Sequence, residues 1–463
     1  METTNAWKKY TANDKKAVFE LGERYKKFIS DCKTERECVK RSIEIAKKAG
    51  YKPLDSYIKK GTKLKAGDKV YAVCMDKAIA MFNIGKKPIE EGMNILGAHI
   101  DSPRLDLKPN PLYEDTEFVL LDTHYYGGIK KYQWVTIPMA IHGVVILKDG
   151  TKKEVVIGED PEDPVVGITD LLIHLASEQM EKNARKVVEG EALDVLIGSE
   201  PAKETKGKTE KDLVKKNILA ILKKNYGIEE EDFYSAELEI VPAGPARDMG
   251  LDRSMIMGYG HDDRICAYTS LEAFIEADKL NKTGVLLLVD KEEIGSVGAT
   301  GMESKFFEYT VAEIINLMSD YSEISLKRAL KNSRMLSSDV SAAYDTNYGS
   351  VFEKKNAAYL GHGVCFNKYT GSRGKSGSND ASAEYIGALR KIMDDAKVAW
   401  QFSELGKVDE GGGGTIAYIL ANYGMEVIDS GIAVLNMHSP YEIGSKADLY
   451  EAVKCYKAFL VKA

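Results

Sequence analysis

The spacing of apolar residues changes from helical to strand-like within the first part of the chain. Apolar side chains recur at helical intervals over residues 15–28 and 35–49, which predicts two amphipathic helices. Short apolar runs follow at 70–74, 78–82 and 93–97, and each has the length of a strand. This part of the chain is therefore predicted to pass from helices into a β-sheet.

Later in the chain, apolar runs lose all alternation of polar and apolar positions. Residues 285–289 read Val-Leu-Leu-Leu-Val, which is typical of a strand buried on both faces of a mostly parallel sheet. Residues 431–436 form a similar run. The first run ends in Asp290-Lys-Glu292-Glu293 and the second leads to His438. Functional groups gather at the carboxyl ends of strands in open α/β sheets, so these residues are expected to converge.

The middle of the chain has a different sequence pattern. It holds short β-type runs at 143–147 and 154–157 and none of the clustered polar motifs found elsewhere. We therefore predict an α/β fold, with a mixed, mostly parallel sheet flanked by helices and a β-rich domain inserted into it. The expected boundaries are 1–107 and 249–463 for the two parts of the α/β domain, and 108–248 for the insert.

Histidines and carboxylates follow several of the strand-like runs. They are His99 and Asp101, Asp262, Glu292 and Glu293, Asp339, and His438. Imidazole and carboxylate are ligands of hydrolytic metals such as zinc, and none of these stretches contains a cysteine. Of two adjacent glutamates, one can bind metal while the other stays free as a general base. The pattern predicts a two-metal hydrolase.

Each of these residues also has a simpler explanation when it is taken alone. His99 could be a core histidine, the Glu292-Glu293 pair a solvated strand end, Asp262 or Asp339 a helix cap, and His438 a turn residue. Their joint occurrence in one order is what favours the metal site.

Charge and cysteine usage limit the partners and the compartment. A net charge of −7 argues against a nucleic-acid or anionic-membrane partner, since both attract basic surfaces. The six cysteines are scattered, the N-terminal residues 1–9 are polar, and no apolar run approaches the about 20 residues that cross a bilayer. We therefore expect a cytoplasmic protein.

The complete order of motifs resembles the aspartyl aminopeptidase family of zinc metallopeptidases. The order is His99-x-Asp101, Asp262-Asp263, Glu292-Glu293, Ser338-Asp339 and Met437-His438, with Tyr126-Gly127-Gly128 and Leu171-Leu-Ile-His174-Leu between them. The resemblance covers nearly the whole chain. Two departures are that Asp263 stands where the family usually has asparagine, and that residues 371–380 differ from the better-known eukaryotic members.

The resemblance implies a zinc-exopeptidase-like fold and a site with two divalent ions per subunit. One ion would be held by His99 and Asp339, the other by Glu293 and His438, and Asp262 would bridge them. Glu292 would be the general base, and Asp101, two residues beyond His99 on an extended segment, would orient the imidazole. Such ligands accept zinc, manganese or cobalt, and the family indicates zinc.

The resemblance also assigns roles outside the metal ligands. His174 would reach the active site of a neighbouring subunit and Lys368 would face the substrate, whereas the simpler alternatives are a core histidine and a solvated lysine. The insert would serve as a dimerisation and lid domain of a dodecamer that is built from dimers.

The expected function is removal of the N-terminal residue from peptides, with acidic or small polar residues among those removed. Another dinuclear deacylase or carboxypeptidase of the same superfamily is the alternative among enzymes. A self-assembling scaffold or cargo protein is the alternative outside enzymes, but a scaffold has no physical need for a free base such as Glu292 beside a metal.

Overall fold

The chain forms two compact units, which are described here from a computed structural model of residues 4–204 and 210–463. Residues 1–3 of the polar N-terminal segment lie outside these described residues. The first unit contains the chain up to Asp101, Ala246–Met437 and Glu442–Ala463, and the second contains Ser102–Pro245 and His438–Tyr441. The contacts thus divide the chain after residues 101 and 245, whereas the sequence pattern placed boundaries after 107 and 248. The proposed roles of the two parts stay predictions.

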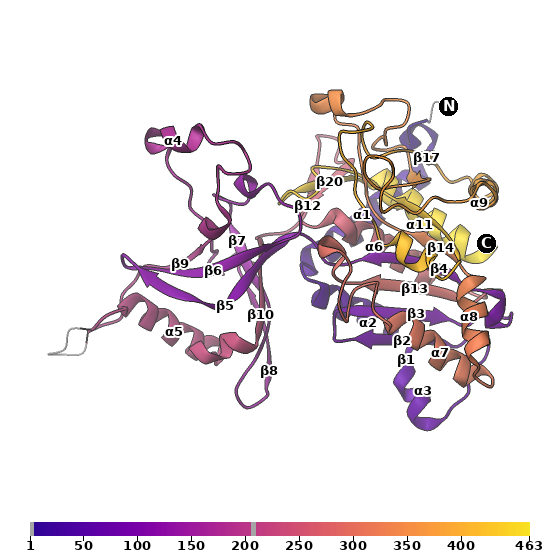
Figure 1. Ribbon diagram of the computed structural model, residues 1–463, viewed down its shortest axis with the longest axis horizontal. Coiled ribbons are helices and arrows are strands. Elements are labelled where there is room, and N and C mark those ends of the chain that lie inside the picture. The colour runs from indigo at the N-terminus through magenta and orange to yellow at the C-terminus, as the bar shows by residue number, and fades with distance from the viewer. Residues whose placement is uncertain (1–3, 205–209) are drawn as a thin grey trace. The chain divides into compact units, whose positions relative to one another are not determined.

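A nine-stranded mixed sheet forms the centre of the first unit (Figure 1). Its four central strands β13, β4, β14 and β18 run parallel to one another, and antiparallel pairings flank them. In spatial order the strands are β1 (Lys52–Pro53), β2 (Lys69–Cys74), β3 (Ala78–Asn83), β13 (Gly284–Val289), β4 (Asn94–His99), β14 (Arg334–Ser337), β18 (Glu426–Gly431), β16 (Val364–Asn367) and β17 (Trp400–Phe402). The strands expected at 70–74, 78–82, 93–97 and 285–289 are confirmed.

Helices cover both faces of this sheet because its central strands are apolar on both sides. Along β13, Leu286 and Leu288 belong to one hydrophobic cluster and Val285, Leu287 and Val289 to the other. The first cluster includes residues of α1 (Ala12–Asp31), α2 (Glu35–Lys48), α6 (His261–Glu276), α9 (Ala383–Asp395) and α11 (Lys446–Lys462). The second includes residues of α3 (Leu54–Lys60), α7 (Phe306–Met318), α8 (Glu323–Lys331) and α10 (Ala417–Ala421). The mixed α/β class with helices on both sides is confirmed.

The two helices expected near the N-terminus are also confirmed, and each begins at a capping box. Thr11 accepts from the Asp14 N–H and the Asp14 carboxylate accepts from Thr11, and Thr34 and Glu37 repeat this exchange at α2. No helix among residues 4–204 and 210–463 combines the length and the apolar character that a membrane crossing requires.

A smaller five-stranded sheet of the first unit corrects the interpretation of residues 431–436. The main-sheet strand β18 ends at Gly431, and β19 (Ala433–Leu435) pairs instead with β15 (Ser341–Ala342) and β20 (Glu442–Ser445). The chain changes sheets at Gly431, where a Cβ would lie 1.9 Å from the Asp339 carbonyl oxygen. The remaining strands of this sheet are β12 (Met255–Gly258) and β11 (Arg247–Met249).

The second unit contains a six-stranded antiparallel sheet, which confirms the prediction that the middle region is rich in β-strands. Its strand order is β8 (Lys152–Ile157), β7 (Met139–Ile146), β10 (Ala236–Pro242), β5 (Arg104–Asp115), β6 (Phe118–Tyr126) and β9 (Val195–Gly198). The α-helices among the described residues of this unit are α4 (Ser177–Met180) and α5 (Leu213–Tyr226).

Candidate metal centre

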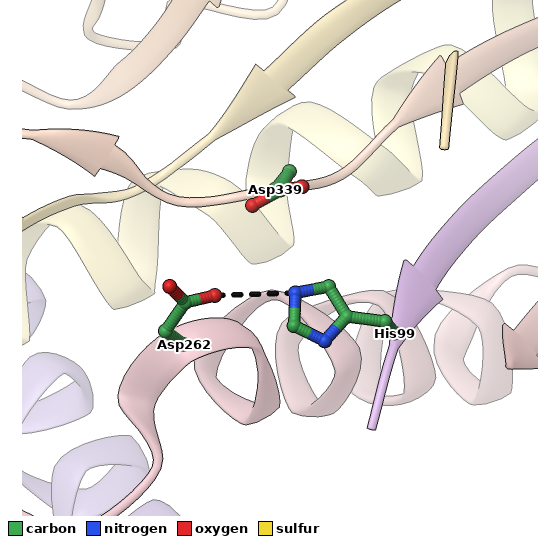
Figure 2. Close-up of side chains that lie close together, drawn as sticks. All are labelled: His99, Asp262 and Asp339. Carbon is green, nitrogen blue, oxygen red and sulfur yellow. Dashed lines mark ion pairs between the residues drawn. The ribbon is translucent and has the colours of Figure 1, made fainter. Parts of the chain in front are cut away.

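Two of the expected ligands leave neighbouring strands at the same edge of the main sheet. Gly97 of β4 lies opposite Ser337 of β14 in a parallel pairing, and His99 and Asp339 each come two residues later. Parallel strands present their carboxyl ends at one edge, so this register alone brings the two side chains together. Figure 2 shows the third expected ligand, Asp262, facing His99 from the start of α6.

These three side chains offer ligand atoms that all lie within 4.8 Å of one another. His99 Nε2 is 3.1 Å from Asp262 Oδ1, and His99 is buried. Two ligands bound to one zinc ion at about 2.0–2.2 Å are separated by roughly 3–3.5 Å in a tetrahedral arrangement. The spacing of His99 and Asp262 therefore fits a shared metal ion.

The tautomer of His99 supports the same conclusion. Its Nδ1 lies 3.0 Å from the backbone carbonyl oxygen of Asp101, and because a carbonyl only accepts, the hydrogen must be on Nδ1. In a neutral ring, Nε2 then carries a lone pair and faces a carboxylate oxygen of Asp262. Two electron-rich atoms at this distance repel unless a proton or a cation lies between them.

The electrostatics of the cluster favour added positive charge. Burial lowers the pKa of His99, but hydrogen bonds with Asp101 and Asp262 more than reverse this effect, so the pKa lies well above its ordinary value. Burial raises the pKa of Asp339 well above its ordinary value, and the negative charge of Asp263 raises it further. A divalent cation among these groups would offset both the burial and the repulsion, so the residues present fit a metal.

The two glutamates lie in a short 3-10 turn, η7 (Glu292–Ile294), directly after β13. Lys291 turns the chain with a φ of 69°, and the Asp101 carboxylate accepts the backbone N–H groups of both Glu292 and Glu293 at 3.2 Å each. The sequence predicted that Asp101 orients His99, and its Oδ1 does lie 3.3 Å from Nδ1. Its hold on the backbone of the glutamate pair was not predicted.

Asp262 has its own support at the start of α6. Its backbone N–H donates to Glu442 Oε2 at 2.9 Å, and the Asp262–Asp263 peptide bond is cis. Asp262 and Asp263 have non-helical backbone angles (φ −81°, ψ 106° and φ −116°, ψ 25°), so the regular part of α6 begins after them and the alternative of a helix cap stays a prediction. The sequence patterns gave no sign of this bond.

His438 lies in the segment of four residues that groups with the second unit, one residue after Met437 of the first. Its φ is 65°, an uncommon conformation for a residue other than glycine. Its Nδ1 lies 2.8 Å from the carbonyl oxygen of Gly128, which places the hydrogen on Nδ1 and, in a neutral ring, the lone pair on Nε2. Its meeting with the other ligands stays a prediction.

The two residues expected to bind substrate are both exposed. Lys368 directly follows β16, and His174 lies in the 3-10 turn η4 (Ile173–Leu175) of the second unit. The neighbours of His174 are also exposed, Ile173 by 66% and Leu175 by 69%. The alternative of a core histidine on a buried apolar stripe is therefore wrong.

Comparison with known proteins agrees with this geometry. The family model described as aminopeptidase I zinc metalloprotease (M18) matches residues 28–460. A probable M18 family aminopeptidase 1 of Clostridium acetobutylicum is 64% identical over 459 residues, covering 99% of this chain and 98% of its own. The crystal structure of an M18 aminopeptidase from Thermotoga maritima has a TM-score of 0.94 at 45% identity, with full coverage of both chains.

A more distant structure shows the fold alone. It is the mApe1 dodecamer of S. cerevesiae, which is 21% identical with a TM-score of 0.76 and covers 94% of this chain and 95% of its own. The match to the family model and the identity to the Clostridium relative extend over nearly the entire chain. The chain therefore belongs to the M18 family of zinc metalloproteases and is an aminopeptidase.

Proposed function

We propose that this aminopeptidase uses water activated between two divalent ions to release an N-terminal residue, with acidic residues among those released. The observation that carries the proposal is the 3.1 Å separation of His99 Nε2 from Asp262 Oδ1 in a buried acidic cluster, with the Nδ1 hydrogen held by the Asp101 carbonyl oxygen. The bound ions would supply a water of lowered pKa and polarise the scissile carbonyl.

We assign His99 and Asp339 to one ion, Glu293 and His438 to the other, and Asp262 to both. The first group is supported by its mutual distances of at most 4.8 Å, and the second by the position of Glu293 after β13 and by the hydrogen on His438 Nδ1, which makes Nε2 its ligand nitrogen. Zinc is the proposed metal because the family is described as zinc metalloproteases.

Glu292 is the group in this arrangement that we propose moves the proton. Its Oε2 lies 3.9 Å from His99 Nε2, and its backbone is fixed through Asp101. The carboxylate would take a proton from the attacking water and pass it to the leaving amine. Asp101 would act as a positioning residue, because it holds both the imidazole and the backbone of the glutamate turn.

Metal removal tests the proposed function directly. A tripeptide with N-terminal aspartate should release free aspartate, the chelated protein should lose nearly all activity, and added zinc should restore it. The measurement is amine release together with elemental analysis of the protein at each step. Full activity in a metal-free sample would contradict the proposal, and release from the C-terminus instead would indicate a carboxypeptidase.

Selectivity for acidic residues should depend on Lys368. A lysine ammonium near the substrate attracts an acidic side chain electrostatically, and it has no such attraction for an apolar side chain. Lys368→Leu should lower kcat/KM for N-terminal Asp and Glu about 10-fold or more while changing Leu and Ala little. Lys407→Leu is the matched control, since Lys407 lies on another loop. Equal losses over the panel would show that Lys368 does not select the side chain.

We also propose a homo-oligomer, a dodecamer of dimers, in which His174 completes the site of a neighbouring subunit. The exposure of His174 and its apolar neighbours supports this role, because monomers rarely leave such a segment open. The related dodecamer of S. cerevesiae carries the same fold. We expect a cytoplasmic location, in keeping with six cysteines that are all free.

Subunit mixing tests the shared site. His174→Ala should impair turnover while metal content stays normal, and mixing it with Glu292→Gln should restore part of the activity. Restoration is expected because some interfaces then pair an intact His174 with an intact Glu292. Light scattering gives the assembly state, and a fully active monomer would end the proposal.

A further inference from the structure

One buried carboxylate of the first unit has no part in the proposed mechanism. Asp429 lies on β18 with only 2% of its surface exposed, opposite Ser337 of β14 and Asn367 of β16. Its Oδ1 accepts a hydrogen bond from Thr415 Oγ1 at 2.5 Å. A buried carboxylate is costly to keep in a fold, so its contact with Thr415 calls for a function.

Thr415 directly follows an exposed run of four glycines, residues 411–414. Its hydrogen bond with Asp429 holds one end of this run, and contacts with Gly371 hold the run at a second point. Gly412 has a φ of 152°, and a Cβ on it would lie 2.0 Å from the carbonyl oxygen of Gly371. The N–H of Gly371 donates to the carbonyl oxygen of Gly413 at 2.7 Å. The glycine run is therefore held against a second loop at one point and against the sheet at another.

The fastened end of this run lies close to the proposed metal centre, because Asp429 is paired with Ser337 of β14, two residues before Asp339. Burial raises the pKa of Asp429 to about 7, and the negative charge of Glu292 contributes to the increase. Burial also raises the pKa of Tyr418, three residues after Thr415, and Glu292 again contributes. The Tyr418 hydroxyl donates to Glu303 Oε1 at 3.2 Å, which ties α10 to the loop that follows Glu292.

We propose that residues 411–414 form a substrate-binding loop whose bare backbone hydrogen-bonds the main chain of the peptide, and that Asp429, Thr415 and Gly412 are its positioning residues. Glycine suits this role because no side chain keeps a peptide from the backbone groups. The inference rests on the proposed function, since it concerns how that site holds its peptide. It assigns the loop to binding and leaves the chemical step to Glu292.

Four variants separate positioning from general destabilisation. Thr415→Val removes the hydroxyl donor, and Thr415→Ser keeps it. Gly412→Ala forces the loops apart, whereas Gly387→Ala on α9 is its matched control, because Gly387 lies outside the glycine run and a Cβ on it would meet nothing within 4 Å. For each variant, kcat and KM are measured with a tripeptide and with an aminoacyl p-nitroanilide of the same N-terminal residue, alongside Tm and metal content.

Thr415→Val and Gly412→Ala should raise KM for the tripeptide about 3- to 10-fold, the cost of one or two lost hydrogen bonds. Their kcat and metal content should stay near the wild-type values. The p-nitroanilide, which lacks the further peptide bonds, should be affected much less. Thr415→Ser and Gly387→Ala should differ from the wild type by less than about twofold in KM.

Several outcomes would overturn the inference. A Thr415→Val protein with lowered Tm and kcat but unchanged KM would show a structural role for the contact. Gly412→Ala that matches Gly387→Ala would exclude the loop from binding, even if Thr415→Val failed to fold. A wild-type protein that releases no amine from any peptide would instead overturn the proposed function itself, so the two failures remain distinguishable.

Discussion

Glu292→Gln is expected to lose most turnover while keeping the fold and both metal ions. Glutamine has nearly the same shape as glutamate but cannot take a proton from water, so a general base is removed without emptying space. The loss should be on the order of 10²–10⁴-fold in kcat. The backbone N–H of residue 292, which binds Asp101, is unchanged by the substitution, so the turn itself should persist.

The matched control for this variant is its neighbour. Glu293→Gln changes the same chemical group one residue later, but it weakens a proposed metal ligand and should therefore lower metal content as well as activity. Steady-state kinetics with elemental analysis distinguishes the two variants. Near wild-type turnover in a metal-replete Glu292→Gln sample would refute the assignment of the base.

Asp262→Ala should have an equally large effect for a different reason. Its carboxylate is the one proposed to touch both ions, and it lies 3.1 Å from His99 Nε2. Without this carboxylate the site has one ligand and one negative charge fewer, so it binds a cation more weakly. Metal occupancy and activity should therefore fall together. Elemental analysis after extensive dialysis measures the first effect, and amine release measures the second.

Asp263→Asn is a suitable control for the bridge. It alters the adjacent carboxylate, keeps its shape, and introduces the residue that the related family usually has at this position. Metal content and activity should therefore stay close to the wild-type values. Two tightly bound ions in Asp262→Ala would move the bridging role elsewhere, and Asp263 would be the first residue to test.

Local sequence patterns were sufficient to predict much of this fold. The helical spacing and capping residues of α1 and α2 act within a few residues of the chain, as does the unbroken apolar run of β13. The expected ligands stood out because strand ends are visible as changes from apolar to polar residues. The order of the motifs along the chain resembles that of a known family, and this resemblance grouped His99, Asp262 and Asp339 as metal ligands.

Tertiary structure alone decided how these residues are held. The Asp101 carboxylate binds N–H groups that are 191 and 192 residues away, and Glu442 binds Asp262 across 180 residues. The departure of β19 from the main sheet depends on how closely Asp339 passes Gly431. Periodicity reports which face of an element is buried but not which distant group will meet it. Hydrogen bonds between distant segments arise only once strand register has fixed their positions.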